Sequence, residues 1–444
     1  MQNRIFKKAA GSAGVALVVV TTAALLSAQS TPLSVLEQQP VSTTPAQPDA
    51  PKPLAELPGE AYKESVRPLE VVRSSMENWS DAEVGALAVG IRKAGEACAQ
   101  GRATTYSGDD LFDFARLCSL GQDWNDAETA AQTYIAGGAE AHRAQAYALK
   151  LTAQVHLNGM DDAVKTANEM LATLPYDAEV AYALRYLKDN LEKASNPAVV
   201  TLGVEEHLTL VKALATGKAL AATHGDAVIG LGALFESGAE LAFLERYSGD
   251  ERGAAITMGE LEGALGDPAR LPWEDRTRIE GIKTQYALLG ERMPQIEIKR
   301  ALLSKTSKTQ IGPDFGVATV LVLFPDWCTQ CRHMMKPLTQ FAVVNGDVPI
   351  HAYGLMFPDE AKMGGQLTHE DDLKDVQGTA TMLITAWAAK SFGAIDYPLA
   401  IVLDAEGLVR NVGVISPDAF DGDSYMGKLI KQMANKDDVR PKAE

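Results

Sequence analysis

The stretch Val317-Ala318-Thr319-Val320-Leu321-Val322-Leu323-Phe324, with Trp327-Cys328-Thr329-Gln330-Cys331 directly beyond it, decides how this chain folds. The apolar run predicts a buried strand, and the two cysteines stand at the predicted start of a helix. Thiols three residues apart on one helical turn can interconvert between dithiol and disulfide with little backbone movement. Unpaired N–H groups and the helix dipole favour a thiolate on Cys328, so Cys328 is the predicted attacking group and Cys331 the resolving one.

Length and composition indicate a globular, multidomain and acidic protein. The chain has 444 residues, which is too long for one ordinary core, so two or three domains are expected. Apolar residues make up 46% and charged residues 22%, values typical of globular proteins. The net charge of −17 repels phosphate backbones and argues against nucleic-acid binding.

The N-terminus predicts export. Arg4, Lys7 and Lys8 precede an uncharged, largely apolar run over residues 9–28, and Ala28-Gln29-Ser30 fits a small-x-small cleavage site. Residues 1–30 are therefore predicted to be a signal peptide, or an uncleaved single membrane anchor. Both interpretations place the body of the chain in the periplasm or another extracytoplasmic space.

Residues 31–74 are predicted to form a Pro-rich disordered linker, because prolines alternate there with small and polar residues. Helical signals begin at the capping box Ser80–Glu83, and residues 75–289 are predicted to be all-helical. Cys98 and Cys118 fall on the inner faces of a predicted helical hairpin. An exported protein pairs its thiols, so a structural disulfide between these two is expected; two buried free thiols, or a relay to Cys328, are the alternatives.

Two segments of this helical region are similar to each other. Positions 36 residues apart carry matching small or apolar residues, namely Ala127, Ala131 and Ile135 against Ala163, Ala167 and Leu171. This pattern resembles tetratricopeptide-like helix pairs, whose repeat has about this length. A generic helical bundle could show the same pattern.

Residues 290–436 follow a different pattern, and residues 437–444 form a charged tail. Strands are predicted at 317–324 and 348–357, a hairpin at 398–403 and 408–414, and helices at 328–344, 373–392 and 424–433. The order β-α-β-α-β-β-α predicts a parallel pair joined to an antiparallel hairpin, with helices on both faces of a mixed sheet.

This C-terminal region resembles the thioredoxin fold, and more closely its exported TlpA-like branch of thiol–disulfide oxidoreductases. The resemblance is carried by Trp327–Cys331 after a core strand, by Asp396-Tyr397-Pro398 before the next-to-last strand, and by the turn Asp404–Gly407. It implies an α/β thioredoxin-like domain without a cofactor. It also implies a cis Tyr397–Pro398 peptide facing the cysteines, where Trp327, Tyr397 and Pro398 line a substrate groove.

The sequence departs from the thioredoxin pattern at several positions. Thr329-Gln330 replace the usual Gly-Pro between the cysteines, and the helix-kinking proline, Pro337, lies one position late. Val322 stands where thioredoxin has a buried carboxylate, which leaves Asp326 and His333 as the nearest titratable groups. Exchange chemistry survives these changes, but its direction and rate do not follow.

The sequence argues against two other roles for the cysteine pair. A zinc site needs two more ligands, and the sequence has neither a second CxxC nor a paired His motif. Haem attachment needs His directly after Cys331, where Arg332 stands instead. Two hypotheses are left: an exported thiol–disulfide oxidoreductase acting on protein substrates and a redox partner, with a helical domain that binds partners, or a non-catalytic scaffold in which Cys328–Cys331 is a passive structural disulfide.

Overall fold

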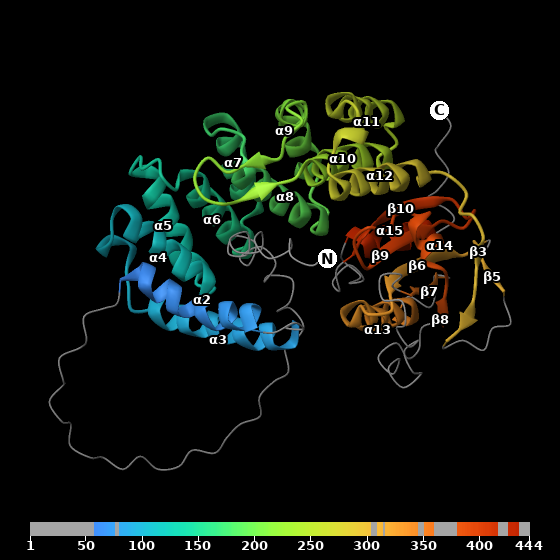
Figure 1. Ribbon diagram of the computed structural model, residues 1–444, viewed down its shortest axis with the longest axis horizontal. Helices are drawn as coiled ribbons and strands as arrows, with labels where there is room; N and C mark the ends of the chain where they lie inside the picture. The colour runs from blue at the N-terminus through green and yellow to red at the C-terminus, as the bar shows by residue number, and fades with distance from the viewer. Residues whose placement is uncertain are drawn as a thin grey trace, which may run out of the picture. The chain divides into compact units, whose positions relative to one another are not determined.

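The computed structural model describes residues 57–75, 80–302, 309–313, 316–344, 350–358, 380–415 and 425–434 (Figure 1). The predicted leader at 1–30, most of the predicted linker and the charged tail lie outside these residues. The chain divides into two compact units. The first takes residues up to Leu187 together with Leu220–Ile229, and the second takes Lys188–Ala219 and everything from Gly230 onward.

The first unit is built from antiparallel helices and one small hairpin. Its helices are α2 (Pro58–Ser75), α3 (Ser80–Cys98), α4 (Gly108–Leu120), α5 (Trp124–Ala136), α6 (Arg143–His156), α7 (Met160–Thr173) and the first part of α8 (Ala178–Lys193), with a 3₁₀ turn η2 (Ala103–Thr105). Its hairpin pairs β1 (Leu220–Ala221) with β2 (Val228–Ile229). Consecutive helices from α2 to α7 pack against each other. Ala127, Ala131, Ala163 and Ala167 are fully buried.

Helix α2 corrects the predicted linker, which included residues 58–74. Pro58 begins the helix, where its missing N–H is not needed, and Pro68 lies inside it. Tyr62 and Leu69 are buried against the neighbouring helices. The composition of residues 31–74 as a whole masked this apolar stripe, and packing in the first unit overrides the cost of an internal proline.

The hairpin β1–β2 corrects the prediction of an all-helical region over 75–289. Strands of two residues are too short to show an alternating pattern, so no local signal announces them. Side chains at the start of α8 hold the hairpin instead. Asp177 accepts a hydrogen bond from the Thr223 N–H at 2.7 Å, and the Tyr182 hydroxyl donates to the Val228 carbonyl at 2.9 Å.

One turn conformation recurs along the helical part of the chain. Gln122, Asn158 and Ser195 all have positive φ, with values of 62°, 59° and 54°. In each case the next residue donates its N–H to the carbonyl five positions back: Asp123 to Cys118, Gly159 to Gln154, and Asn196 to Leu191. This is the hydrogen bond that closes a helix through a left-handed residue. These three turns are spaced by 36 and 37 residues, and a fourth of the same kind, at Gly249, follows Ser195 after 54 residues.

The second unit begins with the end of α8 and four further helices, and continues into a mixed sheet with helices of its own. The four further helices are α9 (Ala198–Leu214), α10 (Leu231–Tyr247), α11 (Glu251–Leu265) and α12 (Trp273–Leu288), with a 3₁₀ turn η3 (Pro268–Arg270). The sheet strands are β4 (Arg300–Ala301), β6 (Ala318–Pro325), β7 (Ile350–Phe357), β8 (Ala380–Leu383), β9 (Leu399–Leu403) and β10 (Val409–Val414). They lie in the order β10-β9-β6-β7-β8-β4, and a separate two-stranded ribbon pairs β3 (Ile296–Glu297) with β5 (Gln310–Ile311).

Helices cover both faces of this sheet. Alternate residues of β6 face opposite sides: Val320 and Val322 pack with α13 (Thr329–Val344) and α15 (Tyr425–Ala434). Leu321 and Leu323 pack with α14 (Ala386–Lys390). Aromatic side chains of α10 and α12 also pack on this second face, namely Phe243, Tyr247 and Tyr286. The helices that precede residue 290 therefore complete the core of the sheet.

The predicted order β-α-β-α-β-β-α differs from the sheet in two places: between β7 and β9, and at the two-residue edge strand β4, which was not predicted. Strands β6 and β7 are parallel, and β9 and β10 form the expected antiparallel hairpin. The predicted helix over 373–392 is wrong in its described part, because Ala380–Leu383 forms β8, parallel to β7, and only Ala386–Lys390 is helical. Strand β8 has only four residues and is followed closely by α14, so the sequence pattern shows no clear boundary between strand and helix. Residues 373–379 lie outside the described part.

Candidate functional site

The cysteine pair lies where the central strand ends and α13 begins. All eight residues of β6 are buried, so the strand is fixed by packing on both faces. The Cys328 N–H donates to the Pro325 carbonyl at 3.1 Å, which closes a tight turn between strand and helix. Helix α13 then starts at Thr329, and Cys328 stands immediately before its first turn. The structure thus confirms the predicted strand–turn–helix setting of the pair.

Cys328 and Cys331 are joined by a disulfide, with their Cα atoms 5.2 Å apart. Cys331 is fully buried in the core between the sheet and α13, whereas Cys328 is only partly buried. The Cys331 N–H points at the Cys328 sulfur, at 3.1 Å. This N–H would also stabilise a thiolate on Cys328 in the reduced protein, since helix N-termini lower thiol pKa values. The two sulfurs are therefore unequal: one is accessible and the other enclosed.

Arg332 is a neighbour whose role the sequence did not reveal. It is only 9% exposed, and its Nη1 donates to the Asp326 carbonyl at 2.8 Å, back across the turn that carries Trp327 and Cys328. This contact holds the turn in place and puts a cation beside the first turn of α13. Asp326 itself is half-buried. The side chains of Thr329, Gln330 and His333 lie outside the described part.

Tyr397 and Pro398 lie at the start of β9, joined by a cis peptide bond. Pro398 is buried, and its carbonyl accepts from the Ile415 N–H at 3.1 Å. Tyr397 is half-buried, and its ring centroid lies 5.3 Å from that of Phe357, with the two rings tilted by 59°. It packs against the same core cluster as Cys328. The structure therefore brings the proline segment and the cysteine pair to one region of the sheet, while the Trp327 side chain is 52% exposed.

Val322 is fully buried in the centre of β6. A carboxylate at this position could exchange protons with the buried thiol, but a valine side chain cannot. Any proton transfer at Cys331 would have to use solvent or another side chain. The predicted departure from the thioredoxin pattern is thus located in the core beneath the disulfide.

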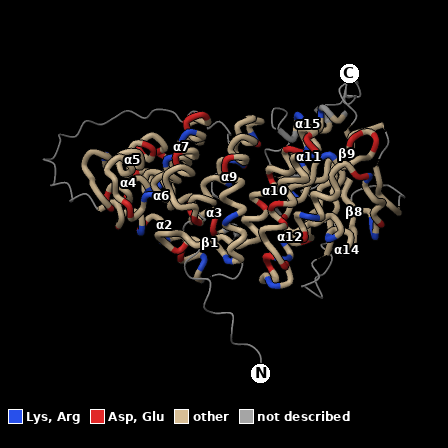
Figure 2. Tube along the Cα trace, turned by 90° about the horizontal axis from the view of Figure 1, so that it is seen from above, with Lys and Arg blue, Asp and Glu red and all other residues tan. Residues whose placement is uncertain are grey.

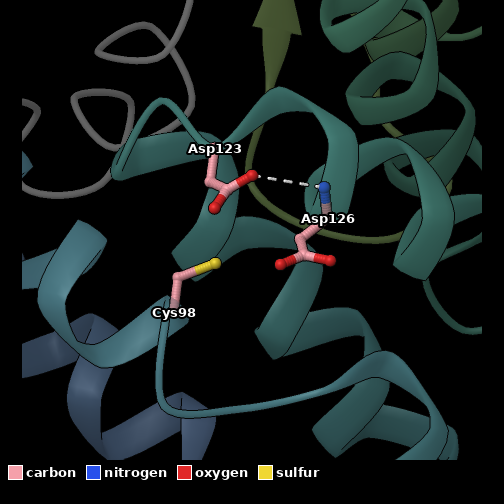
Figure 3. Close-up of side chains that lie close together, drawn as sticks. All are labelled: Cys98, Asp123 and Asp126. Carbon is pink, nitrogen blue, oxygen red and sulfur yellow. Dashed lines mark hydrogen bonds between the residues drawn. The ribbon is translucent and has the colours of Figure 1, made fainter.

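The second disulfide joins Cys98 at the end of α3 to Cys118 in α4, and both residues are fully buried. Figure 3 shows Cys98 close to Asp123 and Asp126, which begin α5. These three side chains are the one group in the described part of the chain close enough to share a metal ion. However, the Cys98 sulfur is bonded to Cys118, and Asp123 accepts from the Asp126 N–H at 3.4 Å as a helix cap. A disulfide sulfur is not a thiolate ligand, so these residues do not fit a zinc site.

Two broader features bear on partners. Lys and Arg positions are scattered among Asp and Glu positions along the described chain (Figure 2), in keeping with the acidic composition. Among the described residues, no helix combines the length and apolarity needed to cross a bilayer. The predicted leader is not among those residues.

No protein-family model matches this chain, and no curated protein does either. Among solved structures, the thioredoxin domain of a thiol-disulfide oxidoreductase from Bacteroides vulgatus is 15% identical, covering 33% of this chain and 98% of that one, with a TM-score of 0.25. A thioredoxin-family thiol:disulfide interchange protein from Chlorobium tepidum TLS is 20% identical, covering 32% and 95%, with a TM-score of 0.24. StoA from Bacillus subtilis is 17% identical, covering 27% and 93%, with a TM-score of 0.21. Likeness at these values assigns no activity, so the chemistry has to follow from the geometry of the site.

Proposed function

We propose that this chain is an exported thiol–disulfide oxidoreductase that exchanges disulfides with protein substrates through Cys328 and Cys331. The observation that carries the proposal is the asymmetry of the pair. Cys328 is partly accessible and receives the Cys331 N–H at 3.1 Å, while Cys331 is enclosed in the core. An accessible sulfur at a helix start and a buried partner one turn away divide the work of attack and resolution.

The exchange proceeds in two balanced steps. In the reducing direction, the Cys328 thiolate attacks one sulfur of a substrate disulfide, forms a mixed disulfide and releases the other substrate sulfur as a thiolate. Cys331, once deprotonated, attacks the Cys328 sulfur and releases the second substrate thiol, so the substrate gains two electrons and Cys328–Cys331 becomes a disulfide. The oxidising direction is the reverse. Trp327, Tyr397 and Pro398 are proposed to line the groove that receives the substrate.

Replacing Cys331 by Ala tests this function, because it removes the resolving thiol and leaves Cys328 able to form the mixed disulfide. We expect the C331A protein to accumulate covalent adducts with disulfide-containing proteins. The adducts should be visible on non-reducing gels and should disappear when a reductant is added. Cys328→Ala is the matched control and should trap nothing. Absence of adducts, together with absence of dithiol–disulfide cycling in the unmodified protein, would sink the proposal.

A passive scaffold is the competing function, in which Cys328–Cys331 is structural. The reduction potential of this pair separates the two, since structural disulfides of exported proteins typically lie below about −300 mV. A higher value supports exchange and also indicates its direction, whereas a lower one supports the scaffold. Cys98–Cys118 provides an internal reference, because both of its sulfurs are fully buried.

The remaining parts of the proposal concern location and partners. Export is inferred from the basic residues and apolar run at the N-terminus, and N-terminal sequencing of protein recovered outside the cytoplasm would distinguish a cleaved leader from a retained anchor. The helical first unit is proposed to bind a partner protein through tetratricopeptide-like helix pairs. The recurrence of the same turn at Gln122 and Asn158 within this unit supports this repeat.

A further inference from the structure

Helix α12 contacts the segment that leads into Pro398. We define this segment as residues 393–398, from Gly393 to Pro398. Three residues of α12, spaced by three and four positions, meet it along one helical stripe: Arg278, Gly281 and Gln285. Residues at this spacing share one face of a helix. Thus α12 presents a continuous side to the 393–398 segment.

The contact at Gly281 is between backbones. A Cβ atom at Gly393 would clash with the Gly281 carbonyl oxygen, and a Cβ atom at Gly281 would lie 2.8 Å from Cγ2 of Ile395. Gly393 also has a φ of 67°, which other residues rarely adopt. Gln285, which is buried, donates from Nε2 to the Gly393 carbonyl at 2.8 Å. The segment therefore begins at a position held directly against α12.

The other end of the contact is ionic. Nη1 of Arg278 lies 2.5 Å from Asp396 Oδ2 and 2.8 Å from Glu236 Oε2 on α10, and Nη2 lies 3.3 Å from Asp396 Oδ1. Burial opposes the charge on Arg278, but Asp396 and Glu236 outweigh it and raise the pKa of its guanidinium. Arg278 thus lies between two carboxylates. Its ion pair with Asp396 holds the residue directly before Tyr397.

We propose that Arg278 and Gln285 are positioning residues for the substrate groove, so that α12 sets the placement of Tyr397 and Pro398 relative to Cys328. The inference rests on the proposed thiol–disulfide exchange. It goes further by assigning to the helical part of the second unit a role in the binding of protein disulfides. Tyr397 and Cys328 pack on the same core cluster, so a shift of the 393–398 segment changes the surface beside the reacting sulfur.

The test replaces Arg278 by Gln in the full-length protein. With insulin as the protein disulfide and dithiothreitol as the electron donor, we expect KM for insulin to rise by about threefold to tenfold, because the groove is misplaced. The rate with the small disulfide 5,5′-dithiobis(2-nitrobenzoate) should stay within about twofold of that of the unmodified protein. The reduction potential of Cys328–Cys331 should not change. Neither quantity depends on the groove. Arg278→Lys, which keeps the charge, should recover most of the insulin KM.

Lys283→Gln is the matched control. Lys283 lies on the same helix and pairs with Glu262 on α11 at 3.0 Å instead of with the 393–398 segment. It should leave insulin KM unchanged. Asp396→Asn removes the same ion pair by changing its partner in the loop, whose side chain is more exposed than that of Arg278. It should reproduce the effect of Arg278→Gln, and it keeps the test decisive if Arg278→Gln folds poorly.

Hydrogen exchange of the backbone amides of residues 393–397 provides a readout that does not depend on activity. We expect faster exchange in R278Q and D396N than in the unmodified protein or K283Q. If the unmodified protein fails to turn over insulin and traps no adduct, the proposed function is wrong, and the exchange data still decide whether α12 holds the segment. Equal amide protection and equal insulin KM in R278Q, D396N and K283Q would overturn the inference.

Discussion

At the scale of single residues, the reactivity of Cys328 depends on what surrounds one sulfur atom. The Cys331 N–H lies 3.1 Å from it, and the start of α13 supplies the favourable end of a helix dipole. Arg332 adds a buried cation that reaches back to the Asp326 carbonyl. A cation and a helix N-terminus both favour the thiolate over the thiol. Both act on Cys328, whereas the missing carboxylate at Val322 concerns proton transfer at Cys331.

Replacing Arg332 by Gln should therefore raise the pKa of the Cys328 thiol in the reduced protein and slow its reaction with disulfides at neutral pH. Arg332→Lys keeps the charge and should lie closer to the unmodified protein. The pH dependence of alkylation by iodoacetamide measures this pKa directly. A Cys328 pKa that is the same in R332Q and R332K would show that the charge has no influence, leaving Arg332 as a backbone tether only.

The residues of the site differ in how far the sequence can reveal them. The spacing of Cys328 and Cys331 is local, and so is the Tyr397–Pro398 dipeptide, so both can be read along the chain. The partners of Asp396 cannot, because Arg278 lies 118 positions away and its direction depends on how α12 packs. Arg332 is local, but a sequence pattern does not show whether its side chain points outward or back over the turn. Long-range contacts and side-chain directions arise only in the folded chain, so no local pattern reveals them.

At the scale of secondary-structure elements, α8, α9 and α10 meet around a buried cation. Nζ of Lys188 lies 2.9 Å from Glu206 Oε2 and 3.2 Å from Glu240 Oε2, and it donates to the Ser237 carbonyl at 2.8 Å. Lys188 and Glu206 are almost completely buried. A buried charge is tolerable only when it is paired and hydrogen-bonded, which these contacts achieve for Lys188. Carboxyl groups nevertheless outnumber the cation.

The excess carboxyl groups bind protons more tightly in the folded protein. Burial raises the pKa of Glu192 to about 8, and the carboxylates of Glu240 and Asp189 act in the same direction. Burial also raises the pKa of Glu240 to about 7, against the effect of Lys188. For Lys188, burial alone would lower the pKa, but Glu206 and Glu240 outweigh it and raise it. The protonated forms of Glu192 and Glu240 therefore favour the folded state.

This arrangement predicts a loss of stability as pH rises. A carboxyl whose pKa is raised on folding contributes its full stability below about pH 4.5, and that contribution is lost as the pH passes through about 7 to 8. The urea midpoint of the second unit should fall between pH 5.5 and pH 8.5. Glu192→Gln should remove part of this fall, worth about 2 kcal/mol at pH 8.5. An identical pH dependence in E192Q and the unmodified protein would contradict the assignment.

The elements themselves were predictable to the extent that their patterns were long. Strand β6 and the β9–β10 hairpin are apolar runs bounded by turn residues, so their positions followed from the sequence. Strand β8 has four residues and lies beside a short helix, and β1 and β2 have two residues each, which is below the length at which periodicity is visible. Helix α2 contains Pro68 and is stabilised by packing that no local pattern records.

At the scale of the whole molecule, the second unit does not begin where the sequence pattern changes. The pattern changes at residue 290, and that position was the predicted domain boundary. Phe243, Tyr247 and Tyr286 nevertheless pack on the sheet face opposite α13, and the compact second unit begins within α8. The sequence pattern shows where helices give way to strands, whereas a domain is defined by the surface that its elements bury together.

Two truncated chains would separate these boundaries. A chain that begins at Ala178 keeps all of α8 and the aromatic residues of α10 and α12, and we expect it to fold. A chain that begins at Gly290 exposes one face of the sheet, so it should melt lower by at least about 5 °C and bind more hydrophobic dye. Equal melting temperatures for the two chains would show that the sheet needs no helix before residue 290.

The contact between Gly281 and Gly393 also constrains how this sequence can diverge. Gly281 lies in a helix and Gly393 in the loop before β9. A methyl group on Gly393 would clash with the Gly281 carbonyl oxygen, and one on Gly281 would press on the Ile395 side chain. A substitution at either position would move the opposite backbone and, through it, the approach to Pro398. The packing of a helix that contains neither cysteine therefore limits which residues the chain can carry ahead of Pro398.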